Sequence, residues 1–382
     1  MFKNGIGIAK KVREHGIAEL LKRLVSNRLN GKFYYNAVKL IFFSNPQGKR
    51  ILGIWDYKSL PWSVGDPLVF VEKLSMLRIE RDAEEVDICI VYDRANPSGN
   101  RRAPYISPAD GQDYALNFLP LFGTCPYLGS IFQFNSREEF YRFLKTSSDR
   151  YSIFPPFGKH LSESYNFADS GYPHFKEMYD FYDTYGYIPY LRIGEKYKQW
   201  AQWFYKTNLP ENTVPVTLSL RQPLSSNNDT EYYRNADPAA WLSFIDQCKE
   251  SFPGVVLVVV GTREEVFDGL REQSNVIIAK DFGTNIMEDC ALIRASFLYM
   301  GTCSGVNAIA LFSDLPHLLF QFPGMDNYGL KMGDNFPFQT DKQKVFSLEV
   351  PVTSELLFNQ FKSLYVKLNR EEWQTPKPFE RR

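Results

Sequence analysis

The feature that most constrains the fold is a regular alternation of apolar strands and amphipathic helices across residues 214–320. Short β-branched runs such as residues 255–261 are typical of strands that are buried on both faces of a parallel sheet. The expected strands are 214–221, 255–261, 275–279, 297–300 and 317–320, and the expected helices are 238–251, 264–271, 286–295 and 304–312. This alternation predicts an α/β fold with a doubly wound parallel sheet.

The turn Gly301-Thr302-Cys303-Ser304-Gly305 lies between one of these strands and the helix that follows it. The first N–H groups of a helix have no intrahelical partner, and the helix dipole makes that end positive, so such a turn suits a phosphate. Glycine also lets the backbone approach a ligand closely. The same residues equally fit an ordinary tight βα turn. Ligands of doubly wound sheets bind beyond the carboxyl ends of the strands, which is where this turn lies.

A second α/β pattern precedes the first. Residues 50–55 and 86–93 are typical of buried strands, with a helix expected from Asp66 to about Arg78. Residues 108–205 are rich in aromatic side chains, and their strands cannot be ordered from the sequence. The polar segment 208–213 reads as a linker. We therefore expect a Rossmann-like acceptor-side domain over 44–208, and a Rossmann-like nucleotide-sugar-binding domain with a C-terminal helix over 209–382.

Charge is balanced overall, with 44 basic and 44 acidic residues, which gives no support to nucleic-acid binding. Residues 1–43 differ, because they carry nine Lys and Arg against two Glu at amphipathic helical spacing. Such a basic helix can dock on an anionic membrane surface, and it can equally pack on its own domain with a solvated basic face. The five cysteines show no metal-ligand or disulfide spacing, which favours reduced thiols and a cytoplasmic protein, peripheral on the inner face of a membrane if that helix docks.

The second half resembles the donor-binding half of GT-B glycosyltransferases, in particular the fucosyltransferase-like and heptosyltransferase-like groups. Three features carry the resemblance: Arg221 closing the first strand of that half, the run Asp289–Ser296, and the pattern Gly301-x-x-Ser-Gly305-x-x-Ala-Ile-Ala310. In the first half, residues 64–68 resemble the Gly-Asp loop of heptosyltransferases. The chain departs from that group at Cys303 and Ala308, where an acid and a histidine are usual.

The resemblance implies transfer of a sugar from a nucleotide diphosphate, whose leaving diphosphate needs positive charge. No Asp-x-Asp motif occurs, and the four histidines are dispersed, so we expect no cofactor and no metal site. Arg221 is the expected catalytic cation, because its planar fork matches phosphate oxygens. Asp66 is the expected base for the acceptor hydroxyl, although a carboxylate at a helix start can also serve as a cap. Asp93 is the runner-up, ahead of His160 and His174.

The expected donor-binding residues lie at the strand ends around this turn. They are Gly261, Thr262, Asp281, Phe282, Thr302, Ser304, Gly305 and Val306. The loops at 261–263 and 280–284 are expected to recognise the base. The polar loop after Arg221, which includes Arg234 and Asn235, fits either a cleft-facing segment or a solvated excursion.

The sequence thus predicts a metal-independent, inverting glycosyltransferase that moves a sugar from a nucleotide sugar to a glycan or lipid-linked acceptor in surface-polysaccharide synthesis. Two alternatives stay open at this point. A nucleotide-sugar 2-epimerase uses the same bilobal architecture, although no clear pair of acid and base groups stands at the strand ends of the first half. A non-catalytic nucleotide-binding or scaffold protein would keep the fold alone.

Overall fold

The computed structural model describes residues 49–57, 63–92, 116–155, 175–222, 232–322 and 340–370. The basic helix predicted in residues 1–43 lies outside this part of the chain, as do Asp93, His160 and His174. Within the described residues, no helix has the length and apolar character needed to cross a membrane.

The first half forms a four-stranded parallel sheet with the strand order β3-β2-β1-β4. Its strands are β1 (Arg50–Asp56), β2 (Glu85–Val91), β3 (Leu128–Phe134) and β4 (Tyr151–Phe154). Its helices are α3 (Gly65–Glu80), α5 (Leu119–Phe122), α6 (Arg137–Ser147) and α7 (Phe175–Tyr185). The two strands and the helix predicted in 50–93 are therefore confirmed, and β3 and β4 are the strands that the aromatic-rich segment concealed.

The second half forms a six-stranded parallel sheet with the order β10-β9-β8-β5-β6-β7. Its strands are β5 (Val214–Ser219), β6 (Val255–Val260), β7 (Val276–Ile278), β8 (Leu298–Thr302), β9 (His317–Phe322) and β10 (Gln343–Ser347). Its helices are α8 (Glu195–Asn208), α9 (Pro238–Ser251), α10 (Ile286–Ala295), α11 (Ala308–Leu311) and α13 (Ser354–Arg370). The five predicted strands are confirmed, and β10 extends the sheet by one. Helix α8 packs against α10, and α13 packs against α9.

The helix predicted over 264–271 is wrong. A single 3₁₀ turn, Arg263–Glu265, stands there, and Val266 is already extended. Gly269 has a φ of +88°, a left-handed conformation that an α-helix interior does not tolerate. The backbone therefore leaves the helix before its second turn.

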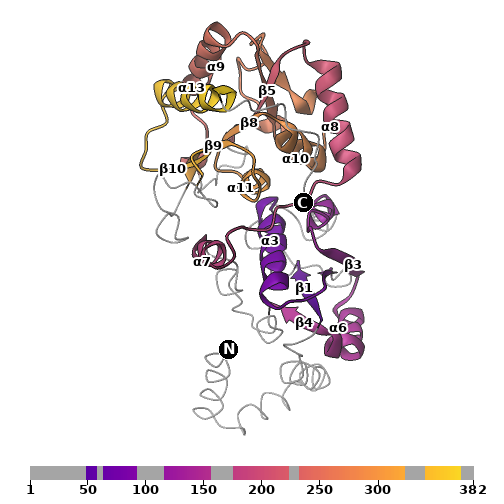
Figure 1. Ribbon diagram of the computed structural model, residues 1–382. Helices are drawn as coiled ribbons and strands as arrows, with labels where there is room; N and C mark the ends of the chain where they lie inside the picture. Colours follow the sequence, from indigo (N-terminus) through magenta and orange to yellow (C-terminus); the bar gives the residue numbers. More distant parts are fainter. Residues whose placement is uncertain are drawn as a thin grey trace.

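The two sheets meet through helices at their carboxyl ends. Figure 1 shows α3 of the first half beside α11 of the second, between the two sheets. One apolar core cluster includes Leu68 and Phe122 from the first half together with Ala308 and Phe312 from the second. The backbone N–H of Leu191 also donates to Phe312 O at 3.0 Å. The hydrophobic core is thus continuous between the two halves, which holds their carboxyl edges toward each other.

Candidate donor-binding site

The turn after β8 is held by a buried hydrogen-bond network. Asn307 Oδ1 accepts from Tyr299 Oη at 2.6 Å and from Ser304 Oγ at 3.0 Å, while its Nδ2 donates to Thr302 O at 2.9 Å. The Ser219 and Ser304 hydroxyls lie 3.0 Å apart. This network fixes the geometry of the turn, and the main-chain N–H groups at the start of the helical turn Gly305–Asn307 are the predicted anion-binding element.

The strand ends on either side of the turn are close because β5 and β8 are neighbours. The backbone N–H of Arg221 donates to Thr302 Oγ1 at 3.0 Å, and Arg221 Nη1 donates to Asn235 Oδ1. A Cβ on Gly301 would lie 2.7 Å from Ser219 O, so only glycine allows this approach of the two strands. Thr302 is fully buried and its hydroxyl is used inside the protein.

Two glycines bring the two halves into backbone contact at this turn. A Cβ on Gly305 would lie 2.5 Å from Gly65 N, and a Cβ on Gly65 would lie 2.9 Å from Gly305 Cα. Gly65 begins α3, and Asp66 is the next residue, accepting a hydrogen bond from Ser63 Oγ. The structure therefore places the predicted base beside the predicted diphosphate turn, although the two come from different sheets.

The predicted residues after β6 lie at the next strand end along the sheet. Gly261 has a φ of +130°, and the N–H of Thr262 donates to Glu265 Oε2 at 2.8 Å. Burial raises the pKa of Glu265, while the Thr262 N–H and the nearby Arg221 guanidinium act against that rise. Glu265 thus links this strand end to Arg221, and nothing in the sequence pattern singled it out.

Asp281 and Phe282 are turned toward other parts of the protein surface. Exposed Asp281 pairs with Arg271 at 2.7 and 3.1 Å, and this guanidinium lowers the pKa of the carboxyl. Phe282 is 55% exposed, and its ring lies edge-on to Phe204 of α8, 5.2 Å between centroids. These side chains already have protein partners, so base recognition by them stays a prediction.

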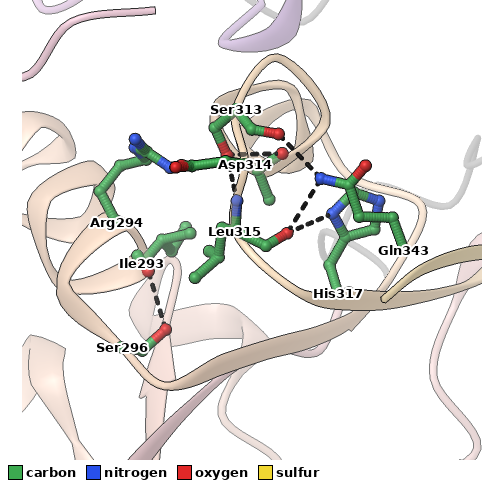
Figure 2. Close-up of polar contacts among 9 residues, drawn as sticks. Ile293, Arg294, Ser296, Ser313, Asp314, Leu315, His317 and Gln343 are labelled. Carbon is green, nitrogen blue, oxygen red and sulfur yellow. Dashed lines mark hydrogen bonds and ion pairs between the residues drawn. The ribbon is translucent and has the colours of Figure 1, made fainter. Parts of the chain in front are cut away.

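The run Asp289–Ser296, which carried part of the family resemblance, makes structural contacts. Asp289 is buried, which raises its pKa to about 6, and its carboxylate lies 3.8 Å from Lys280 Nζ in the loop after β7. Figure 2 shows the other end, where Arg294 pairs with Asp314 at 3.2 Å and Ser296 Oγ donates to Ile293 O at 2.7 Å. Residues 289–296 thus hold in place the loop after β7, through Lys280, and the loop before β9, through Asp314.

His317 is the first residue of β9. It therefore lies at the amino ends of the parallel strands, whereas the candidate site lies beyond their carboxyl ends. Figure 2 shows its Nδ1 facing Leu315 O, 3.0 Å away, with Gln343 beside it. Burial lowers the pKa of His317 to about 4. A histidine kept neutral at this position has a structural role.

The contribution of His317 to stability should therefore fall in mild acid. Between its usual pKa of about 6.5 and a folded value of about 4, the unfolded chain binds the His317 proton and the folded chain does not. The contribution of His317 to the free energy of unfolding should drop by roughly 3 kcal/mol as the pH falls through this window. Urea titrations from pH 7.5 to 4 measure the drop, and His317→Asn, whose amide can still donate to Leu315 O, should flatten it. Equal slopes for both proteins would contradict the assignment.

The comparisons with known proteins agree with this architecture. No protein-family model matches the sequence, and no curated protein matches it. Among solved structures, the chain is similar to the E. coli ADP-heptose LPS heptosyltransferase II, with 13% identity and a TM-score of 0.52 over 84% of this chain and 99% of that chain. The chain has the GT-B fold. A glycosyl transferase family 9 protein from Veillonella parvula DSM 2008 gives the same identity and TM-score over 85% of this chain and 99% of that chain.

In this GT-B fold, the structure brings together Arg221, Ser304, Gly305 and Val306 at one strand-end cluster and sets Asp66 across from them. Gly261 and Thr262 adjoin the cluster through Glu265. Sequence reasoning missed the inner network of Ser219, Tyr299 and Asn307. One signal was present, because Asn307 stands three residues after Ser304, where one turn of a helix brings side chains together.

Proposed function

We propose that the chain is a metal-independent, inverting glycosyltransferase that moves a sugar from a nucleotide diphosphate to a glycan or lipid-linked acceptor, in surface-polysaccharide synthesis. The observation that carries the proposal is the contact between Gly65 and Gly305, which sets Asp66 beside the diphosphate turn. Two neighbouring proteins of the same fold are named as a heptosyltransferase and a glycosyl transferase. A cytoplasmic site of action, peripheral on a membrane through residues 1–43, completes the proposal.

The proposed reaction is a single displacement at the anomeric carbon of the donor sugar. Asp66 accepts the proton of the acceptor hydroxyl while the acceptor oxygen forms its bond to that carbon. The bond from the carbon to the diphosphate oxygen breaks, and the diphosphate leaves with the electron pair. Arg221 and the main-chain N–H groups from Ser304 to Val306 stabilise the negative charge that develops on the leaving group.

A panel of nucleotide sugars tests this function directly. We expect one nucleoside diphosphate to raise the melting temperature, and its sugar conjugate to donate to a glycan or lipid-linked acceptor in the presence of EDTA. Incubation with the nucleotide sugar alone separates an epimerase, which converts the donor without an acceptor. Failure of every nucleotide to stabilise the protein would favour a scaffold.

The contact between the halves gives a separate prediction. In Gly305→Ala, the added methyl group would lie 2.5 Å from Gly65 N and 3.2 Å from Gly65 Cα, both backbone atoms that cannot rotate away. The halves must shift apart, so we expect kcat to fall by roughly 100-fold, as a displacement of about 1 Å in an active site can produce. Nucleotide affinity, measured by calorimetry, should change much less.

The matched control is Gly254→Ala, because a Cβ at Gly254 meets no atom within 4 Å. It should keep wild-type kcat. Wild-type turnover in Gly305→Ala would show that the contact does not position Asp66.

A further inference from the structure

Two arginines from different segments reach the same turn. Arg221 follows β5, and Arg234 ends the 3₁₀ turn η4 (Tyr232–Arg234). Arg234 Nη1 lies 3.8 Å from Cys303 Sγ, in the middle of the diphosphate turn. Arg221 Nη1 donates to Oδ1 of Asn235, the residue after Arg234, so the two guanidiniums come from neighbouring positions at this turn. Burial raises the pKa of the Cys303 thiol, and Arg234 and then Arg221 act against that rise.

The segment that carries Arg234 is held firmly against the strand ends. The N–H of Ala236 donates to Arg221 O at 2.8 Å, and Gln321 Nε2 donates to Asn235 O at 3.0 Å. Gln321, the next-to-last residue of β9, has a φ of 57°, a left-handed conformation that costs a non-glycine residue energy. Strain at the carboxyl end of β9 thus accompanies the placement of Arg234.

The electrostatics of this arrangement favour an anion with charge on two adjacent groups. Both guanidiniums are half-buried, where like charges repel more strongly than in water. Glu265 lies near Arg221, and its carboxylate, which also accepts from the N–H of Thr262, interacts with the Arg221 charge. A diphosphate bound at the turn has two phosphoryl groups that can each accept from one planar fork, whereas a monophosphate has one.

We propose that Arg234 is a second cationic ligand of the donor diphosphate, and that the pair Arg221 and Arg234 makes the site select a diphosphate over a monophosphate. This inference rests on the proposed function and names the part of the donor that the site recognises. The rival explanation is that Arg234 only packs against the Cys303 sulfur.

Calorimetric titration of the full chain with inorganic pyrophosphate and inorganic phosphate tests the inference without knowledge of the base or sugar. Arg234→Gln should weaken pyrophosphate binding by roughly 10-fold or more and change phosphate binding by less than about 3-fold, because a phosphate can still bind at Arg221. Arg234→Lys keeps the charge but loses the planar fork, so its affinity for pyrophosphate should lie between those of wild type and Arg234→Gln. Arg142→Gln is the matched control, since Arg142 is exposed on α6 and pairs with Glu138.

The outcomes separate the two proposals. Pyrophosphate binding that survives Arg234→Gln but is lost in Arg221→Gln overturns the role of Arg234 and leaves the proposed function standing. Equal losses for phosphate and pyrophosphate in Arg234→Gln also overturn it, because they indicate a distorted site. If Arg234→Gln does not fold, wild-type affinity in Arg234→Lys overturns it and intermediate affinity supports it. A wild-type chain that binds no pyrophosphate overturns both proposals.

Discussion

Arg221→Ala is expected to lower kcat/KM for glycosyl transfer by roughly 1000-fold, the upper range for removing one group that stabilises an oxyanion. The guanidinium supplies positive charge to the leaving diphosphate, and a neutral methyl group cannot replace it. The melting temperature should stay within a few degrees. The main chain of Arg221 holds this strand end, because its N–H donates to Thr302 Oγ1 and its carbonyl accepts from the Ala236 N–H, and truncation of the side chain keeps both bonds.

Initial-rate kinetics and thermal unfolding of the same preparations check this expectation. Arg142→Ala provides the control, because it removes an exposed arginine far along the chain from the site. A large loss of melting temperature in Arg221→Ala would instead assign the side chain to structure through its contact with Asn235.

Glu72→Met is expected to stabilise the protein. Glu72 lies on α3 with no exposed surface, and neither of its carboxyl oxygens has a hydrogen-bond partner among the described residues. Burial raises its pKa well above the usual value. Methionine has similar length and no polar atom to satisfy, so the free energy of unfolding at pH 7 should rise by about 1–3 kcal/mol. Urea titration measures the change.

The pH dependence identifies the cause of that stabilisation. The folded chain holds the Glu72 proton at pH values where the unfolded chain has released it, so the contribution of Glu72 to wild-type stability should fall as the pH rises above about 4.5, opposite in sign to the contribution of His317. Glu72→Gln and Glu72→Met should both flatten this decline. Glu80→Gln, at the exposed end of the same helix, should leave it unchanged. If Glu72→Met is less stable than wild type at pH 7, the carboxyl has a partner role that the structure does not show.

Local sequence patterns predicted helices and strands correctly where burial is uniform along a segment. The residues of β6 are all buried and β-branched or leucine, so their apolar run identified the strand. The bounds of α9 and α10 were predicted as observed, because each begins after a capping residue, Asp237 or Asn285. In contrast, β3 alternates irregularly between half-buried and exposed positions, so its sequence carries neither a continuous apolar run nor a clear period of two.

The sequence by itself determined the α/β class, the strand ends that carry Arg221 and Gly305, and the Gly-Asp start of α3. Those features depend on neighbours along the chain, through periodicity, capping and turn chemistry. Only the tertiary structure decided that Gly65 contacts Gly305, that Arg234 reaches Cys303, and that Glu72 is buried without a partner among the described residues. These relations join segments far apart in the chain. The packing of α3 against α11 brings Gly65 to Gly305, and the pairing of neighbouring strands in the second sheet, with η4 against β9, brings Arg234 to Cys303.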